Sequence, residues 1–273
     1  MAKKCRYRNT NRFTIALLAS SSLLFLLTVS KTLKTLANEG KKHNVNTPIL
    51  FQPPSGEETP EDTEGGGSRD DSNSCDQDIV NQGAKNVGNS STLTAVAPIG
   101  YNGLTTVSHP TFWIELPKTS AQQAILLIKE GSSSNWHQLV THSQQSIDLK
   151  GKAGIVGIKL AQDAPGLKIG KNYQWVVALV CGDRPNPNDP LVAAGIKRVA
   201  ESQITLDVPT TVTQLERASL YAEKGIWYDV LNILVAEKSS SSNWNNIWVK
   251  YLQSGGLADD IVRKPIIGEL NRK

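Results

Sequence analysis

Trp227, Tyr228 and Asp229 are neighbours near the C-terminal end of the chain and combine two aromatic rings with an acid. Aromatic side chains beside a carboxylate are typical of surfaces that bind sugars or peptide segments. The three residues follow Gly225, and helical spacing offers an alternative in which Trp227 packs in a core while Asp229 points to water. We name Trp227, Tyr228 and Asp229 as candidate partner-binding residues and keep core packing as the alternative.

The histidines do not form a pattern typical of a metal or catalytic site. His137 and His142 are five residues apart on an expected strand, which places them on opposite faces, and no cysteine or acid stands at ligand spacing. His109 has only Ser108 beside it, whereas a general base needs an acid or a nucleophile nearby. We interpret all of these residues as structural.

The loop 182–190 carries Asp and Asn side chains whose oxygens could bind calcium. It lacks the regular spacing, the glycine and the closing Glu of a helical calcium loop, so we interpret it as an ordinary turn. The sequence has no glycine-rich phosphate loop, nucleophile elbow or zinc-protease signature. We therefore assign no catalytic residue, no metal ligand and no cofactor.

Cys75 and Cys181 are the two cysteines that lie outside the N-terminal segment, which contains Cys5. Two is the smallest number that can pair in an oxidising compartment, and we predict a disulfide. It would close a loop of about 100 residues, which the chain-entropy model values at up to about 4 to 5 kcal/mol. The alternative is two unrelated buried thiols.

Residues 1–37 have the three parts of a secretory signal peptide. A cationic start reaches Arg12, an apolar run extends from Phe13 to Val29, and Thr35 and Ala37 stand before a cleavage site. An uncleaved anchor is the alternative, although the apolar run is short for a membrane span. Positive charge before the run holds the N-terminus in the cytoplasm, so in both cases the rest of the chain is exported to the periplasm or the exterior.

The basic net charge of +4 also comes from this segment, which holds seven of the 29 Lys and Arg residues and no acid. The remaining 22 basic residues face 25 acidic residues, a net charge of −3. A nucleic-acid-binding protein would need its Lys and Arg clustered in the folded part. We expect no nucleic-acid partner.

The sequence predicts a disordered linker at 38–73 and an all-β domain at 74–205. The linker range is rich in Gly, Pro, Ser and acids and poor in apolar residues. The β-rich runs are Leu93–Ala97, Thr111–Leu116, Ala124–Lys129, Trp136–His142, Ile155–Leu160, Tyr173–Cys181 and Val192–Ala200. Alternating residues and intervening turns favour an antiparallel β-sandwich, and Trp113 indicates one strand buried on both faces.

After Pro209 the apolar pattern changes to helical spacing, which predicts a helical hairpin and a capping helix over 206–265. The hairpin resembles one tetratricopeptide repeat. One such repeat cannot bury its own apolar face, so we expect a third short helix with Trp244, Trp248 and Leu252 to cap it. Residues 266–273 are expected to be a tail.

Four segments in order resemble the cyanobacterial family catalogued as domain of unknown function 928. They are HPTFWIELP, DAPGLKIGKNYQWVVALVC, YAEKGIWYDVLNIL and WVKYLQSGGL. The similarity covers about Cys75 to Pro265, and the ordered series is more specific than any one segment. It implies exported bacterial proteins with a β-rich part and a helical tail, and it supplies no catalytic residues.

These observations predict an exported cell-envelope protein that works as a non-catalytic protein-binding module. The alternative is an envelope carbohydrate-binding protein or a hydrolase that uses the loop 182–190. The expected partner is an envelope protein or polysaccharide. Contact with a membrane is expected only through the N-terminal segment, if that segment stays uncleaved.

Overall fold

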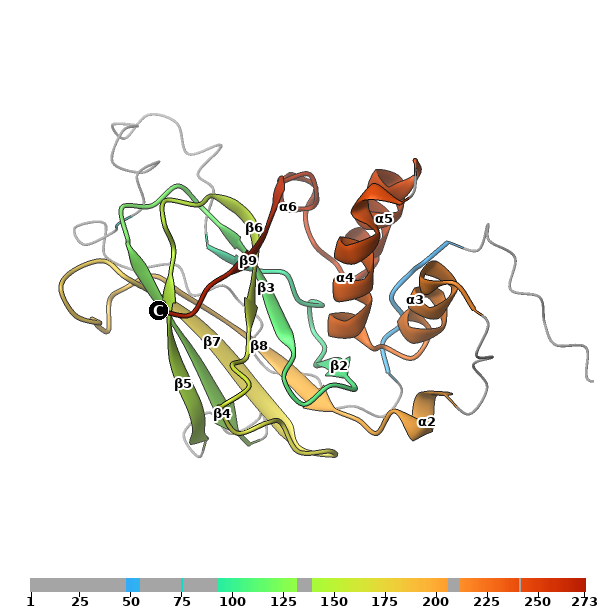
Figure 1. Ribbon diagram of the computed structural model, residues 1–273, viewed down its shortest axis with the longest axis horizontal. Coiled ribbons are helices and arrows are strands. Elements are labelled where there is room, and N and C mark those ends of the chain that lie inside the picture. Colours follow the sequence, from blue (N-terminus) through green and yellow to red (C-terminus); the bar gives the residue numbers. More distant parts are fainter. Residues whose placement is uncertain (1–47, 55–74, 76–92, 132–138, 206–211, 241) are drawn as a thin grey trace, which may run out of the picture. The chain divides into compact units, whose positions relative to one another are not determined.

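The computed structural model describes residues 48–54, 75, 93–131, 139–205, 212–240 and 242–273 (Figure 1). All of them belong to one compact unit that starts at Asn44. The predicted signal peptide, its cleavage site and His137 lie outside the described residues.

The first sheet has four strands in the order β1-β3-β6-β9. Their bounds are Thr94–Ala95 for β1, Thr111–Leu116 for β3, Gly154–Lys159 for β6 and Ile266–Leu270 for β9. β3 pairs antiparallel with β1 and β6, whereas β9 pairs parallel with β6. The sheet is therefore mixed.

The second sheet has five strands in the order β2-β8-β7-β4-β5. Their bounds are Gly103–Thr105 for β2, Gln123–Glu130 for β4, Val140–Asp148 for β5, Asn172–Val180 for β7 and Leu191–Arg198 for β8. The pairs among β8, β7, β4 and β5 are antiparallel, and β2 pairs parallel with β8. Two parallel pairs thus correct the expected purely antiparallel arrangement.

The two sheets contact each other through large apolar side chains. Phe112 of β3 and Trp175 of β7 lie with their ring centroids 5.3 Å apart. All six residues of β3 are buried, and Trp113, on the opposite face from Phe112, donates a hydrogen bond from its indole N–H to Asn232. The prediction of a strand buried on both faces is confirmed, because helices cover the side of β3 that carries Trp113.

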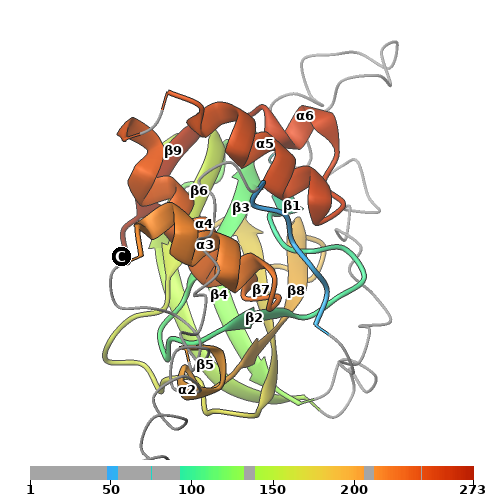
Figure 2. The ribbon, with the colours of Figure 1, turned by 90° about the vertical axis from the view of Figure 1, so that its right-hand side faces the viewer.

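Helical segments follow the strands of the second sheet. They are α2 (Ser202–Thr205), α3 (Gln214–Ala222), α4 (Trp227–Ala236), the 3₁₀ turn η3 (Glu237–Ser239), α5 (Trp244–Ser254) and α6 (Asp259–Val262). Thr213 and Glu216 form a capping box that starts α3. α4 packs on α3 and also contacts β2 and β3 (Figures 1 and 2). One core cluster includes residues from both sheets and from the helices.

Three parts of the secondary structure differ from the prediction. β5 runs from Val140 to Asp148, later than the predicted Trp136–His142, because it is a mostly polar edge strand without an apolar signal. β2 was not predicted, since three residues that start with glycine carry little pattern. The predicted tail 266–273 contains β9, and Arg272 then bridges to Ile147 of β5 in the other sheet.

The predicted linker 38–73 includes one segment that the structure places against the helices. Ile49 and Phe51 are buried, with 5% of each exposed. The Gln52 N–H donates to the Ala222 carbonyl at 3.0 Å. Two apolar residues spaced two apart therefore order residues 48–54, although the composition of the whole range favours disorder.

Candidate functional site

Two of the predicted partner-binding residues, Trp227 and Tyr228, are core residues with no exposed surface. The Trp227 ring stacks on Tyr251 at 4.7 Å, and its indole N–H donates to the Val96 carbonyl at 3.0 Å. Both side chains are enclosed by other residues of the chain, as the core-packing alternative expects.

The Tyr228 ring reaches from α4 into the space between the two sheets. Its hydroxyl accepts a hydrogen bond from the Trp175 indole at 2.6 Å and donates one to the Gly195 carbonyl at 2.9 Å. Burial raises the pKa of Tyr228 far above its usual value, so the hydroxyl keeps its proton. A side chain on Gly103 would meet the Tyr228 ring at 2.6 Å, so this glycine is needed for the close approach of β2 to α4.

Asp229, the third predicted residue, does not point to water as expected. It is 8% exposed, and its carboxylate accepts hydrogen bonds from the Thr105 hydroxyl at 2.6 Å and the Thr106 N–H at 3.0 Å. Burial raises the pKa of the Asp229 carboxyl, and the bonds from Thr105 and Thr106 oppose that effect. Asp229 thus fixes the end of β2 to α4 and borders a surface hollow described below.

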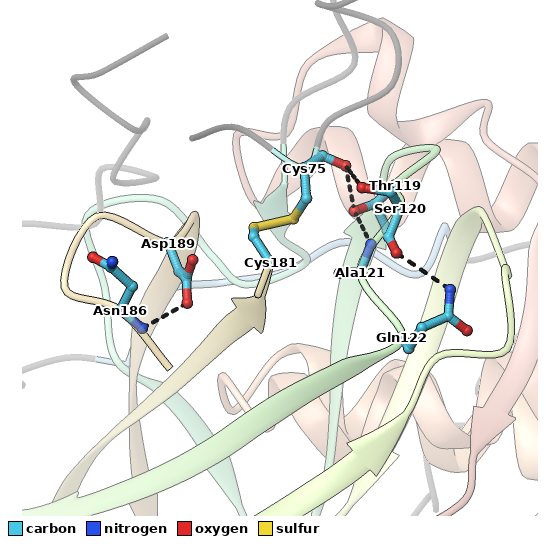
Figure 3. Close-up of a disulfide and its surroundings, with 8 residues drawn as sticks. All are labelled: Cys75, Thr119, Ser120, Ala121, Gln122, Cys181, Asn186 and Asp189. Atoms are coloured by element: carbon cyan, nitrogen blue, oxygen red, sulfur yellow. Dashed lines mark hydrogen bonds between the residues drawn. A yellow bond between two sulfur atoms is a disulfide. The ribbon is translucent and has the colours of Figure 1, made fainter. Parts of the chain in front are cut away.

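The predicted disulfide joins Cys75 and Cys181, which are 106 positions apart (Figure 3). Cys181 follows β7 directly. The Cys75 carbonyl also accepts hydrogen bonds from the Ser120 N–H at 2.8 Å and the Thr119 hydroxyl at 2.7 Å. Cys75 is therefore held covalently at β7 and by hydrogen bonds at the residues that precede β4.

The loop 182–190 has the geometry of a turn. The Asp189 carboxylate accepts a hydrogen bond from the Asn186 N–H at 2.8 Å (Figure 3). The Asn186 side chain accepts one from the Asn188 N–H at 2.9 Å. Across the described ranges, no group of three or more His, Cys, Asp or Glu side chains could hold a metal ion. One side-chain oxygen of Asn186 and one of Asp189 are therefore used within the loop.

The two described histidines both bind backbone carbonyls. The His142 Nε2 contacts the Pro165 carbonyl at 3.0 Å. The His109 Nε2 contacts the Ala164 carbonyl at 3.0 Å, and a carbonyl can only accept, so Nε2 carries the proton. His109 Nδ1 is then an acceptor for the Ser108 hydroxyl at 2.9 Å. This places a hydroxyl, an imidazole and a carbonyl in series.

A cavity of about 550 Å³ lies between α4 and the side of the first sheet that faces the helices. We call it the α4 cleft. Its wall and floor include Ser108, His109, Trp113, Lys159, Gln162, Asn232, Val235, Ala236 and Glu269. Trp113 is almost fully buried and holds Asn232 at 2.9 Å, so the indole forms a rigid base under polar side chains.

A second cavity of about 260 Å³ adjoins the first at Val107 and Asn232, which line both. We call it the α3 hollow. It is bordered by Thr106, Glu201, Arg217, Tyr221, Asp229 and Ile233. The Arg217 guanidinium donates to Glu201 at 2.9 Å and to the Tyr221 hydroxyl at 2.9 Å. The two cavities together give a surface with successive depressions along α4.

Charge differs between the two cavities. In the α3 hollow, Arg217 already pairs with Glu201. In the α4 cleft, Lys159 is exposed and forms no ion pair with any described residue, whereas Glu269 accepts a hydrogen bond from the Thr111 hydroxyl at 3.1 Å. Lys159 is thus the cation in the α4 cleft that remains available to an acidic group.

Sequence reasoning missed the α4 cleft because its residues come from separate elements. Lys159 ends β6, Asn232 lies on α4, and Glu269 lies on β9, which was expected to be part of a tail. The only available signal was Trp113, whose position on the opposite face of its strand indicated a covered sheet. That signal locates the helical layer but not the space beneath it.

The model of one protein family matches this chain. The family is described as Domain of Unknown Function (DUF928), and the match covers residues 64–266, which include α4 and most of the α4 cleft. No curated protein and no solved structure matches the chain. In the part of the chain that the structure describes, no helix is long and apolar enough to cross a membrane.

Proposed function

Because the chain belongs to the family described as Domain of Unknown Function (DUF928), whose description names no activity, we propose a function from the geometry of the α4 cleft. We propose an exported cell-envelope protein that binds a partner protein through this cleft. The observation that carries the proposal is a cavity of about 550 Å³ above a tryptophan that is fixed by Asn232. Its lining includes Lys159, which is exposed and forms no ion pair among the residues that the structure describes.

The size and lining of the α4 cleft support binding. Its volume lies within the range of about 300 to 1,000 Å³ that is usual for ligand sites. Trp113 and Asn232 hold each other, so the base of the cleft is organised before a partner arrives. A preorganised base lowers the entropic cost of association.

The adjoining α3 hollow favours a peptide segment as the ligand. Two depressions that meet at Val107 and Asn232 suit successive side chains of an extended chain. Lys159 favours an acidic side chain in the first depression, and Ile233 with the Tyr221 ring favours an apolar side chain in the second. The proposed partner is therefore a protein segment with an acidic and an apolar residue close together.

Two features that position the cleft belong to the same proposal. We infer that the two sheets form a β-sandwich, which the contact between Phe112 and Trp175 supports. We also infer that α3 and α4 are a tetratricopeptide-like unit, which the packing of α3 on α4 supports. The disulfide is compatible with an exported protein, because disulfides persist in oxidising compartments.

Site-directed crosslinking tests the proposal. A photoreactive amino acid at Gln162, which is exposed on the cleft wall, should crosslink to a partner protein in envelope preparations. The matched control is the same amino acid at the exposed Gln122, which does not line the cleft. Crosslinks at Gln122 alone, or at both positions equally, would contradict binding in the cleft. A crosslink from Gln162 to a polysaccharide would show that the ligand is a polysaccharide and would contradict a protein partner.

Hydrolysis is the second candidate function, and we propose it for the pair Ser108 and His109 instead of the loop 182–190. The Ser108 hydroxyl donates to His109 Nδ1 on the wall of the cleft, which is the contact of a nucleophile with its base. The Ala164 carbonyl replaces the usual carboxylate. A fluorophosphonate probe should label the wild-type chain and not Ser108→Ala; equal labelling of both, or of neither, excludes this candidate.

A further inference from the structure

Residues 48–54 form an extended segment that lies on the helices, and we call it the N-terminal strap. It is the blue segment beside α3 and α5 in Figures 1 and 2. Ile49 and Phe51 are buried, whereas Leu50 between them is 39% exposed. The alternation shows that one face of the extended segment packs on the helices and the other faces outward.

Phe51 is the main anchor of the strap. Its ring packs edge-on against Trp227, with the centroids 5.1 Å apart and the planes at 90°, and lies 6.3 Å from Tyr101. Edge-to-face contacts of this kind are a preferred geometry of aromatic pairs. The helical layer therefore offers an aromatic socket of defined shape to one side chain of the strap.

We call the surface under the strap the groove; its residues are Tyr101, Ala222, Gly225, Trp227 and Ser254. Gly225 shapes the end of the groove that contacts Pro54. Its φ of +74° favours glycine, and a side chain there would meet Pro54 Cδ at 2.8 Å. The turn between α3 and α4 thus leaves space that the proline of the strap fills. Gly225 thus allows both the turn between α3 and α4 and the close approach of Pro54.

Within the described part of the chain, two hydrogen bonds hold the strap. The Phe51 N–H donates to the Ser254 hydroxyl at 2.8 Å, and the Gln52 N–H donates to the Ala222 carbonyl at 3.0 Å. Pro48, Pro53 and Pro54 have no N–H to donate. The contact is therefore a docked peptide with two buried side chains, not a strand of either sheet.

The groove and its occupant have different places relative to the family domain. Trp227, Gly225 and Ser254 lie within the matched range 64–266, whereas the strap lies before it. The family domain therefore supplies the groove, and a segment that precedes this domain in the same chain binds in it.

We propose that this groove is a peptide-recognition site for an extended Ile-x-Phe-x-Pro-Pro segment, occupied here in cis. The strap leaves the groove without unfolding of the sheets, and the strap of a second copy of this chain takes its place. The site is separate from the α4 cleft and does not depend on the function proposed there.

Hydrogen exchange in the full chain tests whether the strap opens by itself. The amides of Phe51 and Gln52 should exchange at least 10-fold faster than those of Trp175 and Val177 in β7. The measurement is made under conditions where opening and closing of the structure are faster than the chemical exchange step. Adding a synthetic peptide with the sequence of residues 47–54 should speed the exchange at Phe51 and Gln52 further and leave β7 unchanged. Exchange of all four amides at one rate, unaffected by the peptide, would overturn the proposal.

Peptide binding to variants tests the specificity of the groove. Phe51→Ala should weaken the bound strap, so that a fluorescent copy of residues 47–54 binds this full-length variant at least 10-fold more tightly than the wild-type chain. Leu50→Ala is the matched control, because Leu50 faces outward, and should bind the peptide as the wild type does. A folded Phe51→Ala variant that binds no peptide would overturn the proposal; if this variant unfolds, peptide competition in the wild-type chain decides.

Discussion

The two halves of α4 differ in burial and in the surfaces that they contact. Its first five residues, from Trp227 to Leu231, are all buried, and Tyr228 reaches between the sheets. Its second half is half-exposed at Asn232 and Val235 and lines the α4 cleft. A helix fixed so firmly at one end can present the other end in a constant position, which a binding site requires.

The comparison also shows why aromatic residues near an acid were misleading as a site. Trp227 and Tyr228 satisfy their polar atoms internally, through Val96, Trp175 and Gly195. A buried aromatic whose N–H or O–H already has a partner has no free polar atom to offer a ligand. The substitutions that would be chosen first to test binding through these residues test stability instead.

The largest effect should come from Trp227→Ala. Removing this fully buried ring leaves a cavity beneath Phe51 and Tyr251, which we expect to lower the free energy of unfolding by about 3 to 5 kcal/mol. Val235→Ala in the second half of α4 should cost about 1 kcal/mol or less, because Val235 is half-exposed. Urea unfolding followed by far-UV circular dichroism measures both, and equal losses would remove the distinction between the two halves.

A smaller effect is expected for Tyr228→Phe, which keeps the ring and removes the hydroxyl. The Trp175 N–H and the Gly195 carbonyl then lose their partner inside the core. The cost should be about 1 to 3 kcal/mol in urea unfolding. Tyr101→Phe is the control, because the Tyr101 side chain is half-exposed, and a cost there as large as at Tyr228 would argue against the buried hydroxyl as the cause.

Strands with an alternating apolar pattern, and the burial of the first half of α4 as one of two alternatives, could be predicted because their signals are local. Phe112, Ile114 and Leu116 alternate within one run, and the predicted strand Thr111–Leu116 is confirmed. β9 could not be predicted, since it pairs with β6 more than 100 residues earlier and its five residues include a glycine. Ile49 and Phe51 were hidden by the polar composition around them.

The candidate site could be predicted only in part, for the same reason. Asp229 was found, but its environment was not, because Thr105 and Thr106 lie more than 120 positions earlier in the chain. Lys159, Asn232 and Glu269 meet only after three elements have packed. A local pattern can name a residue type, whereas the side chains around it depend on contacts distant in sequence.

Asp229 lies in the first half of α4, and its protonation should make the stability of the protein depend on pH. Its folded-state pKa lies above the reference value of 3.8, so just above pH 3.8 the folded protein binds more protons than the unfolded chain. The unfolding free energy of the wild type, minus that of Asp229→Asn, should therefore fall as pH rises through this window. A pKa difference of one corresponds to about 1.4 kcal/mol.

Asp163 provides a control of opposite sign for this measurement. The hydrogen bond from Arg272 lowers the pKa of the exposed Asp163 carboxyl. The unfolding free energy of the wild type, minus that of Asp163→Asn, should therefore fall as pH falls below 3.8. The change should be small because the pair of Asp163 and Arg272 is exposed. Denaturant unfolding at a series of pH values gives both difference curves. If the difference between the wild type and Asp229→Asn does not change with pH, the Asp229 carboxyl has the same pKa in the folded and the unfolded state.

The smallest effect on stability, and the largest on binding, is expected for Lys159→Glu in the α4 cleft. Lys159 is exposed and makes no ion pair with the described residues, so the unfolding free energy should change by no more than about 0.5 kcal/mol. An acidic group of the partner would instead meet a like charge, and like charges at an interface cost several kcal/mol. The partner crosslinked at Gln162 should therefore be lost.

Lys152→Glu separates this effect from a general change of charge, because Lys152 is also exposed and does not line the cleft. It changes the net charge by the same amount and should leave the crosslink at Gln162 intact. If both variants lose the partner, long-range charge controls the interaction and the cleft does not. If only Lys159→Glu loses it while keeping its stability, the cleft beside the second half of α4 is a binding surface, and the buried first half of the helix holds it in position.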